Sequence, residues 1–145
     1  MKVQKKNKIE LTNAHPEISL SLERYRDMIC RVINREKISL RSLHIITVGD
    51  EYLKELHKQF LHKDSFTDVL TFHLDEEGQR EGEIYISLDQ AKLNANEYGV
   101  ELSEEIARLI IHGLLHLKGY NDAEHAGKQQ MHQLENEYLK RFWSV

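Results

Sequence analysis

The chain has 145 residues, of which 40% are hydrophobic and 30% charged, and its net charge is −4. This composition is ordinary for a globular protein with a sizeable core, and the negative charge excludes a strong overall attraction for nucleic acid. The single cysteine, Cys30, excludes an internal disulfide framework and fits a reducing cytoplasm, and we expect it to be buried on a helix. No apolar run is long enough to cross a membrane, and the N-terminus lacks a signal-peptide core, which favours a cytoplasmic protein.

The charges are divided unevenly along the chain. Residues 1–72 hold 13 Lys and Arg against 10 Asp and Glu, whereas residues 73–145 hold 7 against 14. Because an acidic half repels RNA at long range, any RNA contact is expected in the first half. The alternative is that these charges only solvate the surface.

The first half of the chain predicts strands and helices in alternation. Residues 9–12 are predicted to form an edge strand, and Pro16 then opens a helix whose core face carries apolar residues at helical spacing: Ile18, Leu22, Tyr25, Ile29, Val32 and Ile33. Residues 43–48 predict a second strand. Asp50 is suited to cap the following helix, whose apolar residues are Tyr52, Leu53, Leu56 and Phe60.

The second half begins with a predicted hairpin. Its strands are residues 67–74 and 83–87, joined by the polar turn 75–81. A helix over residues 89–98 should stop at Gly99, and Ser103 can cap the next helix. A last helix is predicted over residues 123–143.

This order of elements predicts the fold class. It favours an α+β sandwich with a small mixed sheet of about four strands, helices packed on that sheet, and an apolar helix over residues 106–118 in the core. Because the chain has no repeats or linkers, residues 1–145 are expected to form a single domain.

Two histidines in that apolar helix are candidate metal ligands. His112 and His116 are four residues apart and therefore lie on one helix face, one turn apart. Imidazole is a good ligand for zinc. The bare spacing is a weak signal on its own. A buried helix, however, partly encloses both rings, so their nitrogens need partners, and a metal ion would supply them.

The segment after this helix offers a third ligand. Glycine readily closes a helix, so the helix should end at Gly119, after which Asp122 and His125 are the two alternatives. Three protein ligands leave a fourth position open for water, which distinguishes catalytic zinc sites from structural ones.

Three stretches of the sequence resemble a known family. The segment HGLLHLKGYND resembles the HGxLHLxGYDH metal-site motif of the YbeY family, the endoribonucleases of rRNA maturation. KDSFTDVLTF resembles the KDxPTDVLSF of that family, and GEIYIS resembles GDIxIS. The stretches lie in the family's order over residues 63–122. The resemblance implies the same fold, with His112 and His116 as ligands of one zinc ion per chain.

The sequence departs from the family pattern at three positions. Asp122 occupies the place of the third histidine, and a carboxylate can also bind zinc, so we favour it over His125. Leu61 stands where the family often has an arginine, and Phe66 replaces a proline. If that arginine binds phosphate, this chain must do so by another residue.

The chemistry expected of such a site is hydrolysis. Zinc with an open position lowers the pKa of bound water to about 7 and polarises a phosphoryl oxygen. The HExxH metalloproteases have a general base directly after the first histidine, whereas this chain has Gly113, which cannot transfer a proton. Glu105 lies one heptad before His112 and is either a partner of an imidazole or an acid near the helix start.

The leading hypothesis is therefore a zinc-dependent, single-strand-preferring endoribonuclease that acts in rRNA maturation, at the 16S rRNA 3′ end, and in ribosome quality control. Its substrate and its partners, rRNA and the ribosome or ribosomal proteins, come from the resemblance alone. Thr67 and Asp68 are candidate substrate-side residues, with fixing the strand start as the alternative. The candidate RNA-contacting residues are Arg24, Arg31, Arg35 and Lys63.

Two other classes remain open. One is a metalloprotease-like or other metallohydrolase. The other is a ribosome-associated binding protein in which the zinc is structural. The nucleophile, water or the RNA 2′-hydroxyl, is also open.

Overall fold

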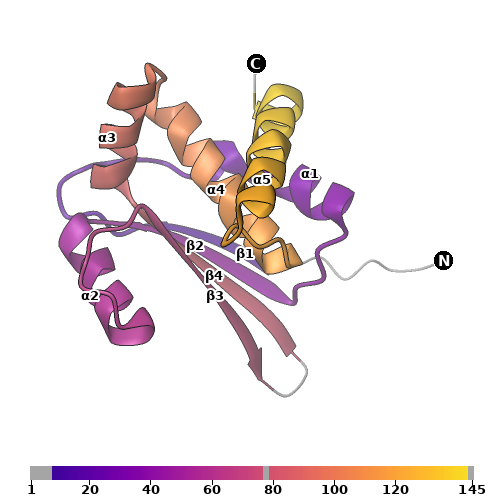
Figure 1. Cartoon of the computed structure of the whole chain (residues 1–145), viewed down its shortest axis with the longest axis horizontal. Helices are drawn as coiled ribbons and strands as arrows, with labels where there is room; N and C mark the ends of the chain where they lie inside the picture. Colours follow the sequence, from indigo (N-terminus) through magenta and orange to yellow (C-terminus); the bar gives the residue numbers. More distant parts are fainter. Residues whose placement is uncertain (1–7, 77–78, 144–145) are drawn as a thin grey trace.

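A four-stranded mixed sheet forms the centre of the computed structural model, which describes residues 8–76 and 79–143 (Figure 1). The strands are β1 (Lys8–Asn13), β2 (Ser42–Val48), β3 (Val69–Glu76) and β4 (Gln79–Ser87). Their order is β1-β2-β4-β3, with β1, β2 and β4 parallel and β3 antiparallel to β4. The predicted mixed sheet and hairpin are thus confirmed, although residues 77–78 of the predicted turn lie outside the described residues.

Helices cover both faces of the sheet. Figure 1 shows α1 (Arg26–Glu36), α4 (Leu102–Lys118) and α5 (His125–Tyr138) on one side and α2 (Asp50–Leu61) on the other, with α3 (Leu88–Tyr98) leading into α4. The α+β class predicted from the sequence is confirmed. Within the described residues, no helix is both long and apolar enough to cross a membrane.

Alternation along the strands supplies a core on each face of the sheet. Leu43 and Ile45 of β2 pack into the larger cluster with α1 and α4, whereas Ile46 and Val48 pack with Leu53 of α2. Successive side chains of a strand point to opposite faces, so one strand can serve both clusters.

The helix α4 lies in the larger core, as its apolar sequence predicts. Its residues Ile106, Ile110 and Leu114 have no exposed surface. The helix approaches β4 closely because Gly113 has no side chain: an added Cβ there would lie 2.8–3.0 Å from side-chain atoms of Ile84. Such contacts are too short for a packed core, so this approach requires glycine.

The first helix begins later than the sequence predicts. A 3₁₀ turn over Glu23–Tyr25 precedes α1, and the segment from Pro16 is irregular. The reason is local hydrogen bonding: the His15 ring nitrogen Nδ1 accepts the backbone N–H groups of Glu17 and Ile18, at 3.0 Å each. Such side-chain bonds hold the backbone in a non-helical path.

Two predicted helix caps and the burial of the cysteine are also wrong. Gly49 is the N-cap of α2, and Asp50 lies inside the helix, where its carboxylate accepts hydrogen bonds from Ser87 and Gln90 at 2.7 and 3.0 Å. The N-cap of α4 is Glu101 rather than Ser103. Cys30 is exposed because it lies on the outer face of α1.

The last predicted helix is shorter at its start and changes type at its end. It begins at His125 rather than at residue 123, and after α5 the chain continues as a π-helical turn, Leu139–Trp143. Trp143 stacks on Tyr25 with ring centroids 4.9 Å apart, which holds this turn against the start of α1.

Candidate metal centre

The helix α4 carries two imidazoles on one face and then stops. His112 and His116 lie one turn apart, and Gly119 ends the helix in the left-handed conformation at φ 119°, as predicted. The N–H of Gly119 bonds to the carbonyl groups of Leu115 and His116, at 3.2 and 3.0 Å. This closure turns the chain back across the face that bears the two rings.

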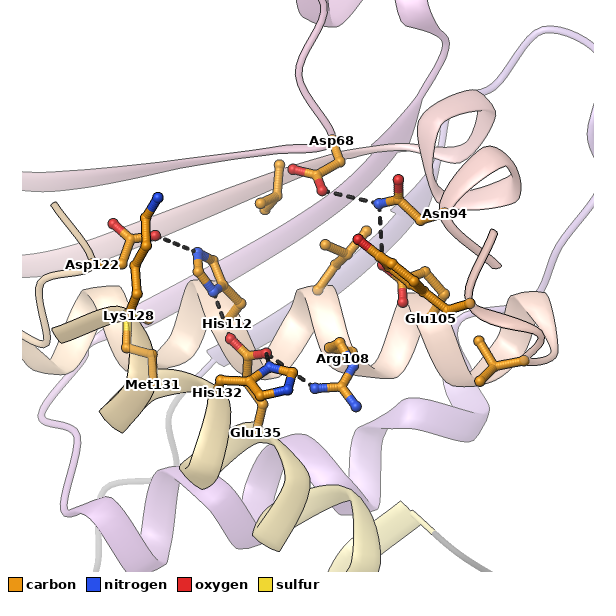
Figure 2. A pocket seen from close by; sticks show the side chains of 14 residues that line it. Asp68, Asn94, Glu105, Arg108, His112, Asp122, Lys128, Met131, His132 and Glu135 are labelled. Carbon is orange, nitrogen blue, oxygen red and sulfur yellow. Dashed lines mark hydrogen bonds and ion pairs between the residues drawn. The ribbon is translucent and has the colours of Figure 1, made fainter. Parts of the chain in front are cut away.

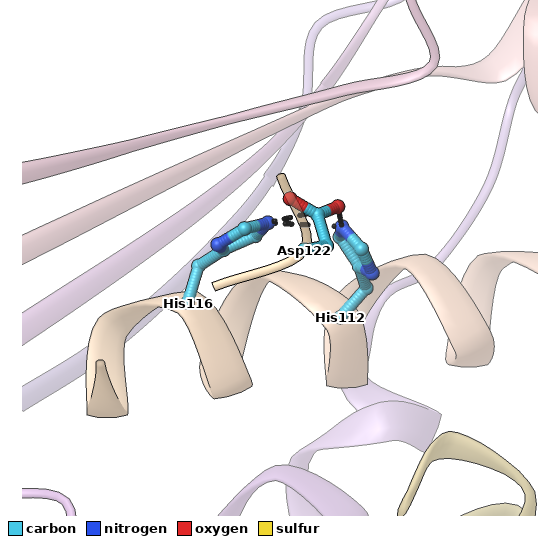
Figure 3. Close-up of side chains that lie close together, drawn as sticks. All are labelled: His112, His116 and Asp122. Carbon is cyan, nitrogen blue, oxygen red and sulfur yellow. Dashed lines mark hydrogen bonds and ion pairs between the residues drawn. The ribbon is translucent and has the colours of Figure 1, made fainter. Parts of the chain in front are cut away.

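Asp122 meets both imidazoles after this turn, as Figure 3 shows. The Nε2 atoms of His112 and His116 are 3.1 Å apart, and the Asp122 Oδ2 atom lies 3.3 and 3.5 Å from them. All three side chains are partly buried, and together they form a group that could hold a metal ion.

The spacing of these atoms fits a zinc ion. Ligand atoms at about 2.0–2.1 Å from zinc in a tetrahedral arrangement are about 3.3 Å from one another. The three observed separations lie between 3.1 and 3.5 Å. His125, the alternative third ligand, begins α5 with an exposed side chain and lies outside this group.

Glu135 of α5 orients the first imidazole. Its Oε2 atom lies 2.7 Å from His112 Nδ1, and a carboxylate can only accept, so Nδ1 carries the proton and Nε2 is left as a ligand atom. Burial lowers the pKa of His112, but the hydrogen bond and the charge of Glu135 outweigh it, and the pKa lies above its ordinary value. Arg108 holds the other oxygen of Glu135 at 3.2 Å.

The partner of the imidazole is thus Glu135, not Glu105. The Glu105 carboxylate accepts a hydrogen bond from Asn94 at 3.2 Å, and Asn94 also donates to Asp68 at 3.0 Å. Burial raises the pKa of Glu105, and the bond from Asn94 only partly offsets this. These three residues line the same cavity as the metal centre, at the end opposite Asp122 (Figure 2).

The helix α5 also fixes the segment that carries Asp122. Gly127 lies under the backbone of Asn121, and an added Cβ would overlap the Asn121 carbonyl oxygen and lie 3.7 Å from Asp122 Cα. The Asn121 side chain in turn accepts the N–H of Ala123 at 2.8 Å. One helix therefore controls both the orientation of His112 and the position of Asp122.

Two cavities open beside the three donor residues. The first has a volume of about 670 Å³ and is lined by His112 and Asp122 together with Arg108, Lys128 and the apolar residues Val69, Val100, Leu109 and Met131. The second, of about 460 Å³, is lined by all three donor residues and by Leu61, Thr67, Asp68, Thr71 and His73. Both volumes are in the range of small-ligand sites.

Thr67 and Asp68, the candidate substrate-side residues, lie beside the metal centre. Both line the second cavity, and Asp68 also lines the first. The backbone carbonyl of Asp68 accepts the N–H of Ser87 at 2.9 Å, so the residue also fixes the start of β3. The structural and substrate-side interpretations of Asp68 are thus compatible.

The four candidate RNA-contacting residues are not gathered at the metal centre. Arg24 lies over the Trp143 ring at 5.0 Å, and Arg31 is paired with Asp27 at 2.8 Å. Arg35 and Lys63 are exposed, and none of the four lines either cavity. Their contact with RNA stays a prediction.

Among the residues at the site that were missed from the sequence are His73, Gly127 and Glu135. The alternation of β3 could have shown that His73 shares a face with Val69 and Thr71. No local signal could have paired Glu135 with His112, because the two are 23 residues apart and meet only when α5 packs on α4.

Comparisons with known proteins agree on one family. The family model described as Endoribonuclease YbeY matches residues 9–143. A protein of that name from Salinibacter ruber is 34% identical over 141 residues, covering 90% of this chain and 89% of its own length. Another from Flavobacterium psychrophilum is 36% identical over 118 residues, covering 81% and 84%.

A solved structure gives the same result for the fold. The solution structure of TM1509 from Thermotoga maritima superposes with a TM-score of 0.67 at 29% identity, and covers 93% of this chain and 89% of that one. The resemblance seen in the three sequence motifs thus extends over nearly the whole chain, and the chain belongs to the YbeY endoribonuclease family.

Proposed function

We propose that this chain is a zinc-dependent endoribonuclease that prefers single-stranded RNA and acts in rRNA maturation, at the 16S rRNA 3′ end, and in ribosome quality control. In this proposal the chain works as one metallohydrolase domain in the cytoplasm, with rRNA and the ribosome or its proteins as partners. Family membership supports the reaction class. The observation that carries the proposal is the convergence of three donor atoms at the spacing of zinc ligands, next to two open cavities.

His112, His116 and Asp122 would hold one zinc ion per chain, and the cavities leave its remaining position accessible. A zinc ion so held supplies a Lewis acid for a phosphoryl oxygen. The donor set fits this metal because two neutral imidazoles and one carboxylate are ordinary zinc ligands.

The other residues of the site position these groups and the substrate. Glu135 keeps the His112 tautomer that leaves Nε2 free to bind, at a hydrogen-bond distance of 2.7 Å. Gly127 keeps the Asp122 segment close to the two rings. Asp68 and Thr67 border the cavity in which a phosphodiester would lie, and Asn94 holds Asp68 in place at 3.0 Å.

A metalloprotease of the HExxH type is disfavoured by the packing of α4. Position 113 points at Ile84 of the sheet, and even a Cβ would be too close to that side chain. A general base at this position therefore has no room, and the helix could not present one to a peptide.

A purely structural zinc is also disfavoured. Structural zinc sites are closed by four protein ligands. Within the described residues the group contains three donors, and these border two cavities.

Cleavage of defined substrates tests the proposal. The zinc-loaded chain is incubated with an end-labelled single-stranded RNA, with the same RNA in a duplex, and with an unfolded protein substrate. We expect cleavage of the single strand, slower cleavage of the duplex, no proteolysis, and loss of cleavage in His116→Ala. Proteolysis without RNA cleavage would contradict the proposal.

The rRNA assignment needs a second substrate pair. A transcript that spans the 16S rRNA 3′ end is compared with a transcript of the same composition in shuffled order. We expect the first to be cut faster and at a defined position. Equal rates at scattered positions would leave a general single-strand endoribonuclease and remove the rRNA assignment.

A further inference from the structure

The second cavity is the place where a reacting phosphate would lie. It is lined by His112, His116 and Asp122, whereas the first cavity is lined by only two of these donor residues. A group that reaches the metal centre through the second cavity therefore faces all three donor residues. A phosphodiester carries a negative charge, and a site that binds it needs a cation or several hydrogen-bond donors.

Lysine and arginine are absent from the described residues that line this cavity. Outside the metal centre, Asp68 contributes a negative charge to this lining, and the exposed Leu61 contributes no charge. His73 is the remaining lining residue that can carry a positive charge. Outside the metal centre, His73 is therefore the candidate cationic group of this lining, beside the hydroxyl donors of Thr67 and Thr71.

The strand β3 directs His73 toward the metal centre. His73 shares a face with Val69, which packs against the larger core, whereas Leu70 packs with α2 on the opposite face. In the hairpin His73 pairs with Gly82. Leu117, the neighbour of His116, packs directly over Gly82: an added Cβ there would lie 2.8 Å from Leu117 Cδ1.

The His73 ring is exposed, and none of the described residues gives it a hydrogen-bond or ion-pair partner. It therefore differs from the other histidines near the site. His112 bonds to Glu135, and His132, which lines the first cavity, lies 3.9 Å from the same carboxylate. The cavity that His73 lines is also lined by the three metal-donor residues. Because both nitrogens of the His73 ring are without a partner among the described residues there, the ring is available to a ligand.

We infer that His73 is a phosphate-binding residue, which donates a hydrogen bond to an oxygen of the RNA phosphodiester held in the second cavity. This inference rests on the proposed function and names the residue that contacts the substrate anion.

Lys128 is the competing cation. Its side chain lines the first cavity on the side of Asp122, as Figure 2 shows, and it has no ion-pair partner among the described residues. Arg108 lines the same cavity but is bound to Glu135 and Asn136, at 3.2 and 2.8 Å. Because the first cavity lacks His116, we assign the reacting phosphate to His73.

Binding of inorganic phosphate to the zinc-loaded chain tests this assignment by calorimetry. The variants are His73→Ala, His73→Arg, Lys128→Ala and, as a matched control, His44→Ala, whose imidazole bonds to Thr12 at 2.8 Å and lines neither cavity. The zinc content of each variant is measured first. We expect His73→Ala to weaken phosphate binding roughly 10- to 100-fold, the range for a charge-assisted hydrogen bond, and His73→Arg to retain most of it.

Single-strand RNA cleavage by the same variants separates this inference from the proposed function. We expect the rate constant to fall with His73→Ala in parallel with phosphate binding. Unchanged binding in His73→Ala, or a loss with Lys128→Ala instead, would overturn the inference even if the wild type cleaves RNA. Phosphate binding that depends on His73 in a wild type that does not cleave RNA would support the inference and overturn the proposed function.

Discussion

The two halves of the metal centre are held in different ways. His112 and His116 belong to α4, whose neighbours Ile111 and Leu115 have no exposed surface, so core packing fixes both rings together. Asp122 lies in a short segment between α4 and α5, where the surrounding residues are mostly exposed. Its position depends on the close approach of Gly127 and on one local hydrogen bond of Asn121.

This difference separates the stability of the fold from the affinity for metal. A change in the packing of α4 should act on folding and move the two histidines as one unit. A change at the Asp122 segment or in α5 should leave the core intact and act on the ligand geometry. Both cases can be measured on the same protein, by zinc affinity and by the free energy of unfolding of the metal-free chain.

The largest loss of zinc affinity is expected for His112→Ala and His116→Ala. Each removes a ligand, so the loss should exceed the roughly 10- to 100-fold that removal of an outer partner of a ligand costs. The His116 side chain is 30% exposed, so metal-free His116→Ala should unfold at nearly the wild-type temperature. His112→Ala also removes a hydrogen-bond partner of the buried Glu135, so its metal-free chain should unfold at a somewhat lower temperature. Competition with a chromogenic chelator and thermal unfolding measure the two quantities. Zinc affinity that survives either change would contradict the assigned ligands.

A smaller loss is expected for Glu135→Gln. This change keeps the shape of the side chain but removes the carboxylate that fixes the His112 tautomer, and roughly a 10- to 100-fold weaker affinity should follow. Glu137→Gln, on the same helix, is the matched control, since Glu137 contacts Arg141 at 3.8 Å rather than a metal-donor residue. Equal affinities of the two variants would remove Glu135 from the metal centre.

A still smaller loss, of about tenfold, is expected for Gly127→Ala, at the mild end of the range for residues around a ligand. This variant best separates the two parts of the metal centre, the helix histidines and Asp122. Alanine stabilises a helix interior by about 0.5–1 kcal/mol relative to glycine, so propensity alone predicts a more stable chain with unchanged zinc affinity. The overlap with the Asn121 carbonyl predicts displacement of Asp122 and weaker zinc binding. A more stable variant that binds zinc as the wild type does would show that the close approach has no role.

The smallest change in zinc affinity, less than about threefold, is expected for Gly113→Ala, since the two histidines stay on one rigid helix. Its effect should appear in folding instead. The added methyl group meets Ile84, which has no exposed surface, and overpacking of a core typically costs about 1–3 kcal/mol. Denaturant unfolding of the metal-free variant checks this value. A large loss of zinc affinity with unchanged stability would reverse the comparison.

Much of the fold could be predicted because its signals are local. The apolar repeat of α4, the stop at Gly119 and the apolar run of β2 each depend on residues close in sequence. The prediction failed where tertiary or side-chain hydrogen bonds compete with these signals. His15 holds the segment after Pro16 out of a helix. Asp50, which was predicted to cap α2, instead accepts a hydrogen bond from Ser87.

The candidate site was predictable to the extent that it is contiguous. His112, His116 and Asp122 lie within 11 residues, on the end of α4 and in the segment after it, so spacing and the family resemblance sufficed to propose them together. The role of Glu135 depends on how α5 packs against α4, which no local pattern records. The alternation of β3 indicates the face on which His73 lies, but not that this face meets the metal centre. The choice between Asp122 and His125 also depended on the path of the chain after Gly119.

Elemental analysis of the purified chain tests the central claim most directly, with the wild type measured beside Asp122→Ala and His125→Ala. We predict about one zinc ion per chain in the wild type and in His125→Ala, and loss of zinc in Asp122→Ala, because three donor atoms at this spacing suit a tetrahedral zinc site. A folded wild type that holds no zinc and takes up none when it is added would contradict the claim. Loss of zinc in His125→Ala alone would move the third ligand away from Asp122.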